Sequence, residues 1–591
     1  MSHKKSNTDP WQMILSMQEP QNLSLGLKIE DWAEQHPDKT FIFFQERNIT
    51  YRQFNEVANQ YANYFASLGF VKGDVVALIL ENDPEYLAAV TGLSKLGVIS
   101  ALVHVGLRAE VLAYAINVID AKAVIVGHEL LTVFDTITQR IRLREPALIF
   151  VEGENPEVTF SEDYQHLNPI LKKCSKENPP TTGDITSDDV LVYMYTSGSF
   201  GARKAVPVFQ KRFLAAGLRI SSLGFMKPDS VDYVGLPLYL NSGFNICFAG
   251  AVMTGSTMLL KQKFSVSKFW SDVRKYNVDY FVGVGEMARY LYALKERKDD
   301  ADNPLRVMLC NGMWGKLIPL FKKRYGLEHV IEVYGTTEGI GVFVNYDEIP
   351  DMCGCLTLNG MRQGEVVRFD LDTEELLRDS NDRLIKCNIG ETGILLGEIN
   401  QLNAFQGYIN DPEATAARVV TNAFKDGDQY FNTKDVVKLG KDDHISFVDR
   451  LGDTYRWKGN TVSASNVADV IVKFFGGIED AIVYGVTVPE HEGRCGMAAV
   501  LMIEGERLDW KQFTQHINQR MPEHARPRFI RMLDSSSTAY ELFPLKQRLR
   551  KEGYNLAMMD DPIYYYKLTE EVYEPLTDEI YKQICGGKIR L

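Results

Sequence analysis

The chain has 591 residues, enough for two large domains or about three to five folding units. Hydrophobic residues make up 45% and charged residues 24%, a globular composition that excludes collagen-like and disordered chains. Asp and Glu number 78 and Lys and Arg 65, so the net charge is −13, which argues against a general nucleic-acid binder. A nucleotide ligand remains compatible with this charge, because one phosphate group needs only a loop and one or two positive charges.

Apolar segments alternate with helical patterns along most of the chain. A hairpin over 40–51 precedes an amphipathic helix over 51–65, in which apolar side chains recur every three or four residues. Further elements follow: strands at 74–80, 122–127, 147–151, 190–195, 256–260, 280–284, 306–310 and 330–333, and helices at 84–97 and 266–276. This alternation predicts an α/β fold, with a large N-terminal domain of layered, mostly parallel sheets and flanking helices. From about Asp449 the pattern becomes that of a smaller α+β unit, so we expect domains at 1–449 and 450–591.

One segment is long enough to be compared with a membrane span. Residues 233–260 carry no charge, and about 20 apolar residues suffice to cross a bilayer. Pro237, Asn241 and Asn245 interrupt the segment, which therefore reads as a strand, a loop, a buried helix and a second strand. The polar N-terminus also lacks the apolar core of a secretory signal. We expect a cytoplasmic protein that is soluble or peripheral at a membrane.

The eight cysteines are scattered, and only Cys353 and Cys355 lie close together. No second pair completes a zinc site, and the histidines show no ligand spacing. We therefore expect free thiols and no transition-metal site.

The sharpest local signal is the segment Tyr193–Lys204. A strand leads into Thr196-Ser-Gly-Ser-Phe-Gly-Ala-Arg-Lys204, in which small residues let backbone N–H groups approach phosphate oxygens and Lys204 supplies a positive charge. The spacing differs from that of the P-loop, and no Ser or Thr follows the lysine. A solvated surface loop is the alternative interpretation.

A second signal, Val333-Tyr-Gly-Thr-Thr-Glu-Gly339, lies at the carboxyl end of a strand, where open α/β sheets bind ligands. Tyr334 offers an aromatic face to a base, Thr336 and Thr337 offer hydroxyls to phosphate, and Glu338 offers a carboxylate to Mg²⁺. An ordinary tight turn would give the same pattern.

A third signal joins Asn432-Thr-Lys-Asp435 to the segment 448–459, which contains Arg450. Asp435 is placed to accept both hydroxyls of a ribose, and Arg450 begins the smaller domain. A charged surface turn is the alternative.

In this order and spacing, the three signals resemble the adenylate-forming superfamily, and within it the very-long-chain acyl-CoA synthetase and fatty-acid transport protein family. The resemblance runs from about Leu25 to the C-terminus. It also rests on the segments 264–270, 275–277, 285–291, 311–312, 449–459, 484–497, 551–554 and 584–591.

The resemblance implies a reaction in which ATP and a fatty carboxylate form an acyl-adenylate and pyrophosphate with Mg²⁺. The small domain then turns about a hinge near residues 452–453, and coenzyme A attacks the adenylate. By the same resemblance Glu338 would hold the metal, and Lys204, Thr337, Glu338 and Lys546 would be catalytic. ATP would be bound by Thr196, Ser197, Gly198, Ser199, Gly201, Lys204, Asn311, Gly312, Tyr334, Gly335, Thr336, Thr337, Asp435 and Arg450. Val284, Gly285 and the helix after Gly243 would line the acyl channel.

The chain departs from the family pattern at three places. Phe200 replaces a hydroxyl residue in the phosphate loop, and Leu240 stands where the family has histidine. The C-terminal catalytic lysine aligns with Phe543, which leaves Lys546 as the second lysine of that motif; a shifted alignment would let Lys546 serve instead. Two alternatives therefore remain open: an adenylate-forming enzyme with another acceptor, and a non-catalytic homologue that binds nucleotide or acyl chain. Peripheral membrane contact and a homodimer also remain open, and no nucleic-acid partner is expected.

Overall fold

The computed structural model describes residues 21–144, 148–153, 163–196, 204–222, 226–313, 315, 317–358, 360–370, 373–400, 404–451, 454–457, 460–474, 476–489, 491, 493–503, 505–533, 548–589 and 591. The chain divides into two compact units. The first comprises residues 1–198, 202–363 and 398–419, and the second 199–201, 364–397 and 420–591. The expected boundary of a moving domain at 449/450 stays a prediction.

The first unit contains a seven-stranded sheet that is parallel except for its last strand. Its order is β7 (Gln165–His166), β6 (Leu148–Glu152), β5 (Ala123–Gly127), β3 (Val75–Ile79), β4 (Ile99–Leu102), β8 (Val190–Tyr195) and β9 (Ala205–Phe209). β3 and β5 are buried throughout, as expected for parallel strands covered on both faces. The accompanying helices are α2 (Leu25–Gln35), α3 (Tyr51–Ser67), α4 (Pro84–Lys95), α5 (Ala109–Asn117), α6 (Leu131–Asp135) and α7 (Leu167–Leu171).

The second sheet of this unit has eight strands. Its order is β15 (Val342–Asn345), β14 (His329–Gly335), β13 (Val307–Asn311), β12 (Tyr280–Val284), β10 (Val231–Val234), β11 (Thr257–Leu260), β1 (Thr40–Phe44) and β2 (Arg47–Thr50). The six inner strands are parallel, and the two edge strands are antiparallel to their neighbours. These bounds confirm the predicted hairpin and the strands predicted from 256 to 333.

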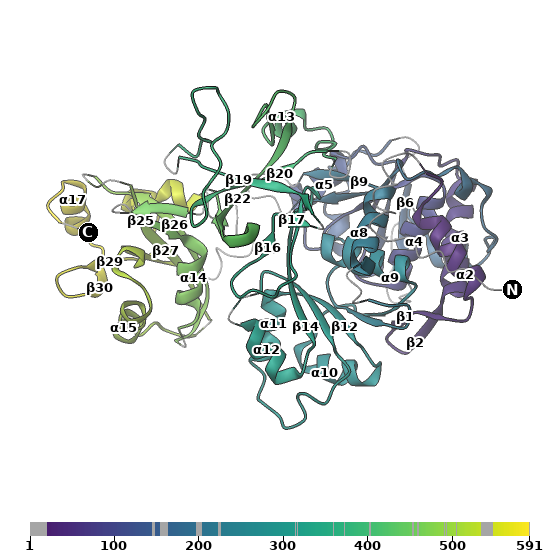
Figure 1. Ribbon diagram of the computed structural model, residues 1–591, viewed down its shortest axis with the longest axis horizontal. Coiled ribbons are helices and arrows are strands. Elements are labelled where there is room, and N and C mark those ends of the chain that lie inside the picture. Colours follow the sequence, from purple (N-terminus) through teal and green to yellow (C-terminus); the bar gives the residue numbers. More distant parts are fainter. Residues whose placement is uncertain are drawn as a thin grey trace. The chain divides into compact units, whose positions relative to one another are not determined.

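Helices cover both faces of the eight-stranded sheet. Figure 1 shows α10 (Val266–Lys275), α11 (Gly285–Tyr292) and α12 (Leu317–Tyr325) beside β12 and β14, where they bury Tyr233, Phe281 and Met308. The opposite face carries Val234, Val282 and Leu309 and packs against three other helical elements: α8 (Gln210–Ser222), η3 (Ser242–Phe248) and α9 (Ala249–Thr254). This alternation of side chains along β10, β12 and β13 follows from the two-residue period of a strand.

The uncharged segment 233–260 has the predicted structure. β10 ends in a loop, the π-helix η3 and α9 follow, and β11 completes the segment. No helix among the described residues is long and apolar enough to cross a membrane.

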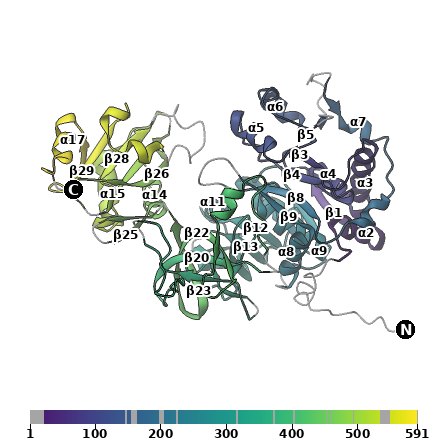
Figure 2. The same ribbon diagram turned by 90° about the horizontal axis from the view of Figure 1, so that it is seen from above.

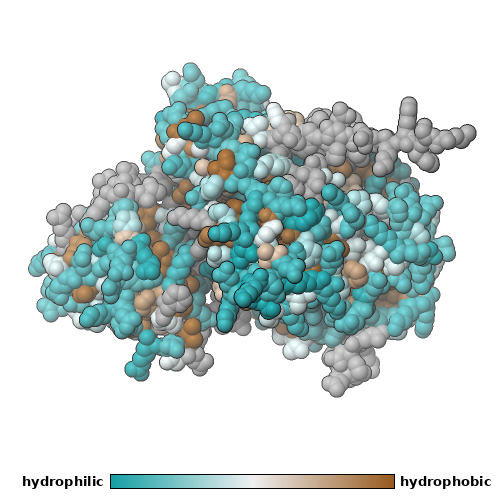
Figure 3. All heavy atoms as spheres, turned by 60° about the horizontal axis from the view of Figure 1, so that its bottom comes forward, coloured by the Kyte–Doolittle hydropathy of each residue, from teal (hydrophilic) through white to brown (hydrophobic). Residues whose placement is uncertain are grey.

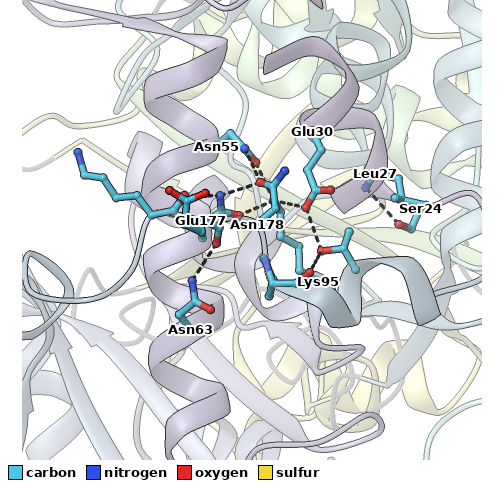
Figure 4. Close-up of polar contacts among 12 residues, drawn as sticks. Ser24, Leu27, Glu30, Asn55, Asn63, Lys95, Glu177 and Asn178 are labelled. Atoms are coloured by element: carbon cyan, nitrogen blue, oxygen red, sulfur yellow. Dashed lines mark hydrogen bonds and ion pairs between the residues drawn. The ribbon is translucent and has the colours of Figure 1, made fainter. Parts of the chain in front are cut away.

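A buried lysine joins three helices of the first unit (Figure 4). The Nζ atom of Lys95, at the end of α4, lies 2.8 Å from Glu30 and donates 2.6 Å hydrogen bonds to Asn55 and Asn59. Both asparagines donate in turn to Asn178. Burial lowers the pKa of Lys95 to about 8, and the Glu30 carboxylate opposes that shift. Because a buried charge is tolerated only when it is paired and hydrogen-bonded, this network fixes α2, α3 and α4 relative to one another.

The remaining short elements of the first unit are β16 (Gly354–Cys355), β17 (Thr357–Leu358), β18 (Met361–Arg362) and α13 (Pro412–Ala416).

The second unit begins with a mainly antiparallel sheet that contains β19 (Gly364–Val367), β20 (Thr392–Glu398), β22 (Gln429–Leu439) and β23 (His444–Arg450), with β21 (Val419–Thr421) paired to β22. A hairpin of β24 (Thr454–Trp457) and β25 (Asn460–Ser463) follows. A five-stranded sheet then runs in the order β26 (Ile478–Thr487), β27 (Arg494–Met502), β28 (Phe529–Leu533), β29 (Ile563–Lys567) and β30 (Val572–Pro575). Figure 2 shows it with α14 (Ala464–Val472), α15 (Trp510–Arg520) and α17 (Asp578–Cys585), the α+β arrangement that the sequence predicts.

The face drawn in Figure 3 is mostly hydrophilic where residues are described. Large hydrophobic side chains that are exposed, such as Val71 and Ile389, come from distant parts of the chain. Scattered exposed hydrophobic residues are normal on a protein surface and indicate no particular partner.

Candidate functional site

The two ends of the predicted phosphate loop lie side by side. Tyr195, the last residue of β8, pairs with Ala205, the first residue of β9, in an antiparallel ladder. The Thr196 amide donates to the Lys204 carbonyl at 2.9 Å, and the Lys204 amide donates to the Thr196 hydroxyl at 3.4 Å. The predicted strand before the loop is confirmed. Ser197, Gly198, Ser199, Phe200 and Gly201 lie outside the described residues.

Lys204 faces a segment that the sequence analysis did not single out. Its Nζ atom lies 4.9 Å from the ring centroid of Tyr408 and 4.0 Å from Oδ2 of Asp411. An ammonium group over an aromatic face is held electrostatically, and here the side chain stays partly exposed, which leaves it able to reach a phosphate.

Tyr408 connects this lysine to the predicted metal ligand. Its hydroxyl donates a 2.6 Å hydrogen bond to Oε1 of Glu338, and both side chains are buried. Burial and the Glu338 charge raise the pKa of Tyr408 well above its ordinary value, so the phenol stays protonated and donates. Lys204, Tyr408 and Glu338 therefore form one cluster.

An arginine of α8 holds the turn after β14 in place. The Arg212 guanidinium donates to the Thr337 carbonyl at 2.5 Å. Desolvation lowers the pKa of Arg212 to about 10, and the nearby Glu338 carboxylate opposes that shift. Gly339 closes the turn with a φ of 75°, and Arg212 fills the space that a Cβ atom would need. The Thr336 hydroxyl is buried and has no hydrogen-bond partner among the described residues, so it is available to a ligand.

The carboxyl ends of β13 and β14 bring Asn311 and Gly312 next to Tyr334. The Asn311 amide group donates to the Val333 carbonyl at 2.9 Å. The Glu332 carboxylate accepts from the backbone amides of Gly312 at 2.7 Å and Met313 at 3.0 Å. Burial raises the pKa of Glu332 to about 8, although both backbone amides favour its charged form. Glu332 thus fixes the loop that would face an adenine.

Asp435 and Arg450 form a pair within the second unit. They are opposite residues of β22 and β23, and Nε of Arg450 lies 3.3 Å from Oδ1 of Asp435. Asp435 is 5% exposed, whereas half of the arginine side chain faces solvent. Asp435, which the sequence assigned to the ribose, therefore has Arg450, another residue assigned to ATP, as its neighbour.

The donor set fits magnesium better than a transition metal. No group of three or more His, Cys, Asp or Glu side chains that would hold a metal is found among the described residues. Glu338 supplies one buried carboxylate, and Mg²⁺ is commonly held by one or two carboxylates together with substrate phosphates.

Other residues singled out in the sequence are placed as follows. Leu240 lies two residues before the start of η3, and its carbonyl accepts from the Phe244 amide at 3.0 Å. Phe543, Lys546 and the expected hinge at residues 452–453 lie outside the described residues. Tyr408, Arg212 and Glu332 were missed, because isolated residues with distant partners carry no sequence signal.

Residues 29–367 match the model of a family described as AMP-binding enzyme. Over 95% of its length, the chain is 34% identical to long-chain fatty acid transport protein 2 of Rattus norvegicus, 90% of which is covered. Over 96% of its length, it is 32% identical to the medium/long-chain-fatty-acid–CoA ligase FadD6 of Mycobacterium tuberculosis, 92% of which is covered. The structure of the anthranilate CoA ligase AuaEII in complex with anthranoyl-AMP matches with a TM-score of 0.71 at 20% identity, over 89% of this chain and 96% of that one, a likeness in fold.

The chain belongs to the AMP-binding enzyme family. Within that family its relatives include long-chain fatty acid transport proteins and a fatty-acid–CoA ligase, each matched over nearly its whole length, which confirms the assignment made from sequence motifs.

Proposed function

We propose that the chain activates a long- or very-long-chain fatty acid with ATP, forming an acyl-adenylate and then acyl-CoA, with release of pyrophosphate and AMP. The observation that carries the proposal is the cluster of Lys204, Tyr408 and Glu338 at the carboxyl end of β14. The match to a fatty-acid–CoA ligase along nearly the whole chain supports the substrate class and disfavours a non-catalytic role.

In the first half-reaction, a carboxylate oxygen of the fatty acid attacks the α-phosphorus of ATP, and pyrophosphate leaves. Lys204 places its charge beside the phosphates, and the hydroxyls of Thr336 and Thr337 donate to them. Magnesium, when bound at Glu338, neutralises charge on the phosphate oxygens. The Tyr408 hydroxyl holds the Glu338 carboxylate in one orientation. Preorganised donors and charges of this kind are a main source of rate enhancement.

The remaining nucleotide contacts are assigned from the family resemblance. Asn311, Gly312 and Tyr334 are assigned to adenine. Asp435 accepts from the ribose hydroxyls while Arg450 orients its carboxylate. In the second half-reaction, after a turn of residues 450–591 about 452–453, the sulfur of coenzyme A attacks the acyl carbonyl carbon and AMP leaves.

The acyl chain is assigned to the face of the eight-stranded sheet covered by η3. Val284 ends β12 and packs against the hydrophobic core that contains Phe244 and Phe248 of η3. Gly285 follows at once, and a Cβ atom there would collide with the Gly312 carbonyl oxygen, so the backbone approaches the adenine loop closely.

The test is product formation from ATP, coenzyme A and a fatty acid such as palmitate, followed by mass spectrometry. We expect palmitoyl-CoA from the unmodified protein and a loss of roughly a hundredfold or more in Glu338→Gln. Glu286→Gln, at an exposed carboxylate of α11, serves as the matched control. Absence of any acyl-CoA across a range of chain lengths would overturn the proposal.

We also place the protein in the cytoplasm with peripheral contact to a membrane, from which a fatty substrate is collected. Carbonate extraction of cell membranes is the test: we expect release into the supernatant, and protein that stays in the pellet would contradict peripheral attachment.

A further inference from the structure

A histidine and a tyrosine from the two sheets of the first unit contact each other just beyond the carboxyl ends of their strands. His104 lies two residues after β4 of the seven-stranded sheet, and Tyr239 lies in the loop between β10 of the eight-stranded sheet and η3. Their ring centroids are 4.4 Å apart, and both side chains are half-buried. Because open α/β sheets bind ligands at this edge, a substrate can reach the contact.

The strand pairing puts this histidine beside the phosphate loop. β4 and β8 are parallel neighbours, with Leu102 opposite Met194 (Figure 2). Continued by two residues, this register brings His104 to the level of Thr196, the first residue of the loop. Neighbouring strands lie about 4.8 Å apart, so the backbone of His104 is close to the backbone that begins the phosphate site.

The loop that carries Tyr239 is anchored to the same edge of the seven-stranded sheet. The side chain of Asn82, three residues after β3, donates to the Leu236 carbonyl at 2.9 Å and accepts from the Leu238 amide at 2.8 Å. Asn82 is buried, and hydrogen bonds formed in the interior are costly to break. The position of Tyr239, and of Leu240 after it, is therefore well defined relative to β3 and β4.

The imidazole ring of His104 is held in one orientation by the turn that follows it. The Gly106 amide donates to Nδ1 at 2.8 Å, so Nδ1 carries no proton and the neutral ring carries its proton on Nε2. A Cβ atom at Gly106 would lie 2.8 Å from Cε1 of this ring, so a side chain there would displace the imidazole. His104 is therefore an oriented hydrogen-bond donor.

We infer that His104 supplies the polar group beside the reacting carboxylate that Leu240 cannot supply. This inference rests on the proposed function. Leu240 stands where the family has histidine, and His104 brings an imidazole from the other sheet to the adjacent side chain, Tyr239. During adenylation, Nε2–H donates to the carboxylate oxygen that does not attack the α-phosphorus of ATP. This hydrogen bond orients the attacking oxygen, and such positioning lowers the barrier of the step.

The experiment measures kcat/KM for palmitate by pyrophosphate–ATP exchange in the full chain. His104→Phe keeps an aromatic ring beside Tyr239 and removes the ring nitrogens, and we expect it to lower kcat/KM by roughly 10- to 100-fold. Its affinity for ATP, measured by titration calorimetry, should stay unchanged. Adding Leu240→His to this variant returns an imidazole to the family position and should restore most of the lost activity. His36→Phe is the matched control, because His36 also contacts an aromatic ring, that of Trp32, and kcat/KM should not change.

The outcomes separate this inference from the proposed function. Unmodified activity in His104→Phe would overturn the inference. A loss that Leu240→His does not restore would also overturn it, because the ring would then matter only for the turn at Gly106. If His104→Phe fails to fold, Gly106→Ala gives the same comparison, since it displaces the ring without removing it. If no fatty acid supports exchange in the unmodified protein, the proposed function fails and the inference fails with it.

Discussion

The hydroxyl of Tyr408 donates a 2.6 Å hydrogen bond to Glu338, a residue 70 positions earlier in the chain. Through this bond, the segment that follows Gly407 is attached to the turn after β14. The ring of the same tyrosine lies under the ammonium group of Lys204. One aromatic side chain therefore contacts both the lysine that ends the phosphate loop and the carboxylate assigned to magnesium.

Replacement of Tyr408 by phenylalanine should raise the Mg²⁺ concentration needed for half-maximal pyrophosphate exchange by roughly tenfold. The variant keeps the ring beneath Lys204 and loses only the bond that orients Glu338, worth about 1.5–3 kcal/mol for a charged acceptor. A magnesium titration of the exchange rate measures this. Tyr64→Phe, which loses a 2.7 Å hydrogen bond to Gln165, is the control. An unchanged magnesium requirement in Tyr408→Phe would remove the tyrosine from the site.

Asp435→Ala should weaken ATP binding by about 1.5–3 kcal/mol, because the ribose hydroxyls lose a charged acceptor. Asp435→Asn should bind ATP with an affinity between those of the unmodified protein and Asp435→Ala, since an amide oxygen still accepts hydrogen bonds. Isothermal titration calorimetry with ATP measures the affinities. Asp426→Ala removes an exposed carboxylate from the same unit and should bind ATP normally. If Asp435→Ala bound ATP as tightly as the unmodified protein does, the assignment of Asp435 to the ribose would be contradicted.

Glu152 should make the protein less stable as the pH rises. Burial raises its pKa from 4.5 to about 7, while the Tyr61 hydroxyl donates to it and opposes the shift. Between these values the folded state binds more protons than the unfolded state, so the unfolding free energy falls as the pH rises, by up to about 3 kcal/mol for this group.

Urea unfolding at about pH 5 and about pH 8 tests this. Glu152→Gln mimics the protonated form and should lose less stability over that range than the unmodified protein. Glu296→Gln, at an exposed position, should behave like the unmodified protein. If the unfolding free energy changed by the same amount between the two pH values in all three proteins, Glu152 would ionise like an ordinary glutamate.

The C-terminal motif yields a kinetic prediction. If the catalytic lysine position is occupied by Phe543, adenylation should be slow while thioester formation from a supplied acyl-adenylate stays comparatively intact. Phe543→Lys should then raise the rate of adenylate formation by up to roughly 10²–10³-fold. Fast exchange in the unmodified protein, abolished by Lys546→Ala, would show instead that Lys546 fills the role.

Sequence patterns were sufficient for many strands of the first unit, although β4 and β9 were not predicted. β3, β5, β12 and β14 are short apolar runs bounded by turn residues, so their periodicity is visible locally. The pairing of Asp435 with Arg450 in one ladder was not predicted, because a register shift between Val436 and Val437 separates this pair from the turn that joins the two strands.

The contacts that hold the site residues in place could not be predicted in the same way. Tyr408 contacts Glu338 across 70 residues, and Arg212 contacts Thr337 across 125. Each belongs to a segment whose local pattern fits an ordinary helix or loop. Contacts of this kind depend on how the sheets and helices pack, and a single sequence contains no periodic signal for them.

The proposed function requires that this chain join a fatty carboxylate to AMP. Exchange of labelled pyrophosphate into ATP reports that step directly, because it requires reversible formation of the acyl-adenylate and does not involve coenzyme A. We predict exchange that depends on added long-chain fatty acid and on magnesium and that is lost in Glu338→Gln. Exchange that never rises above the background without fatty acid, at any chain length, in folded protein that binds ATP, would contradict it.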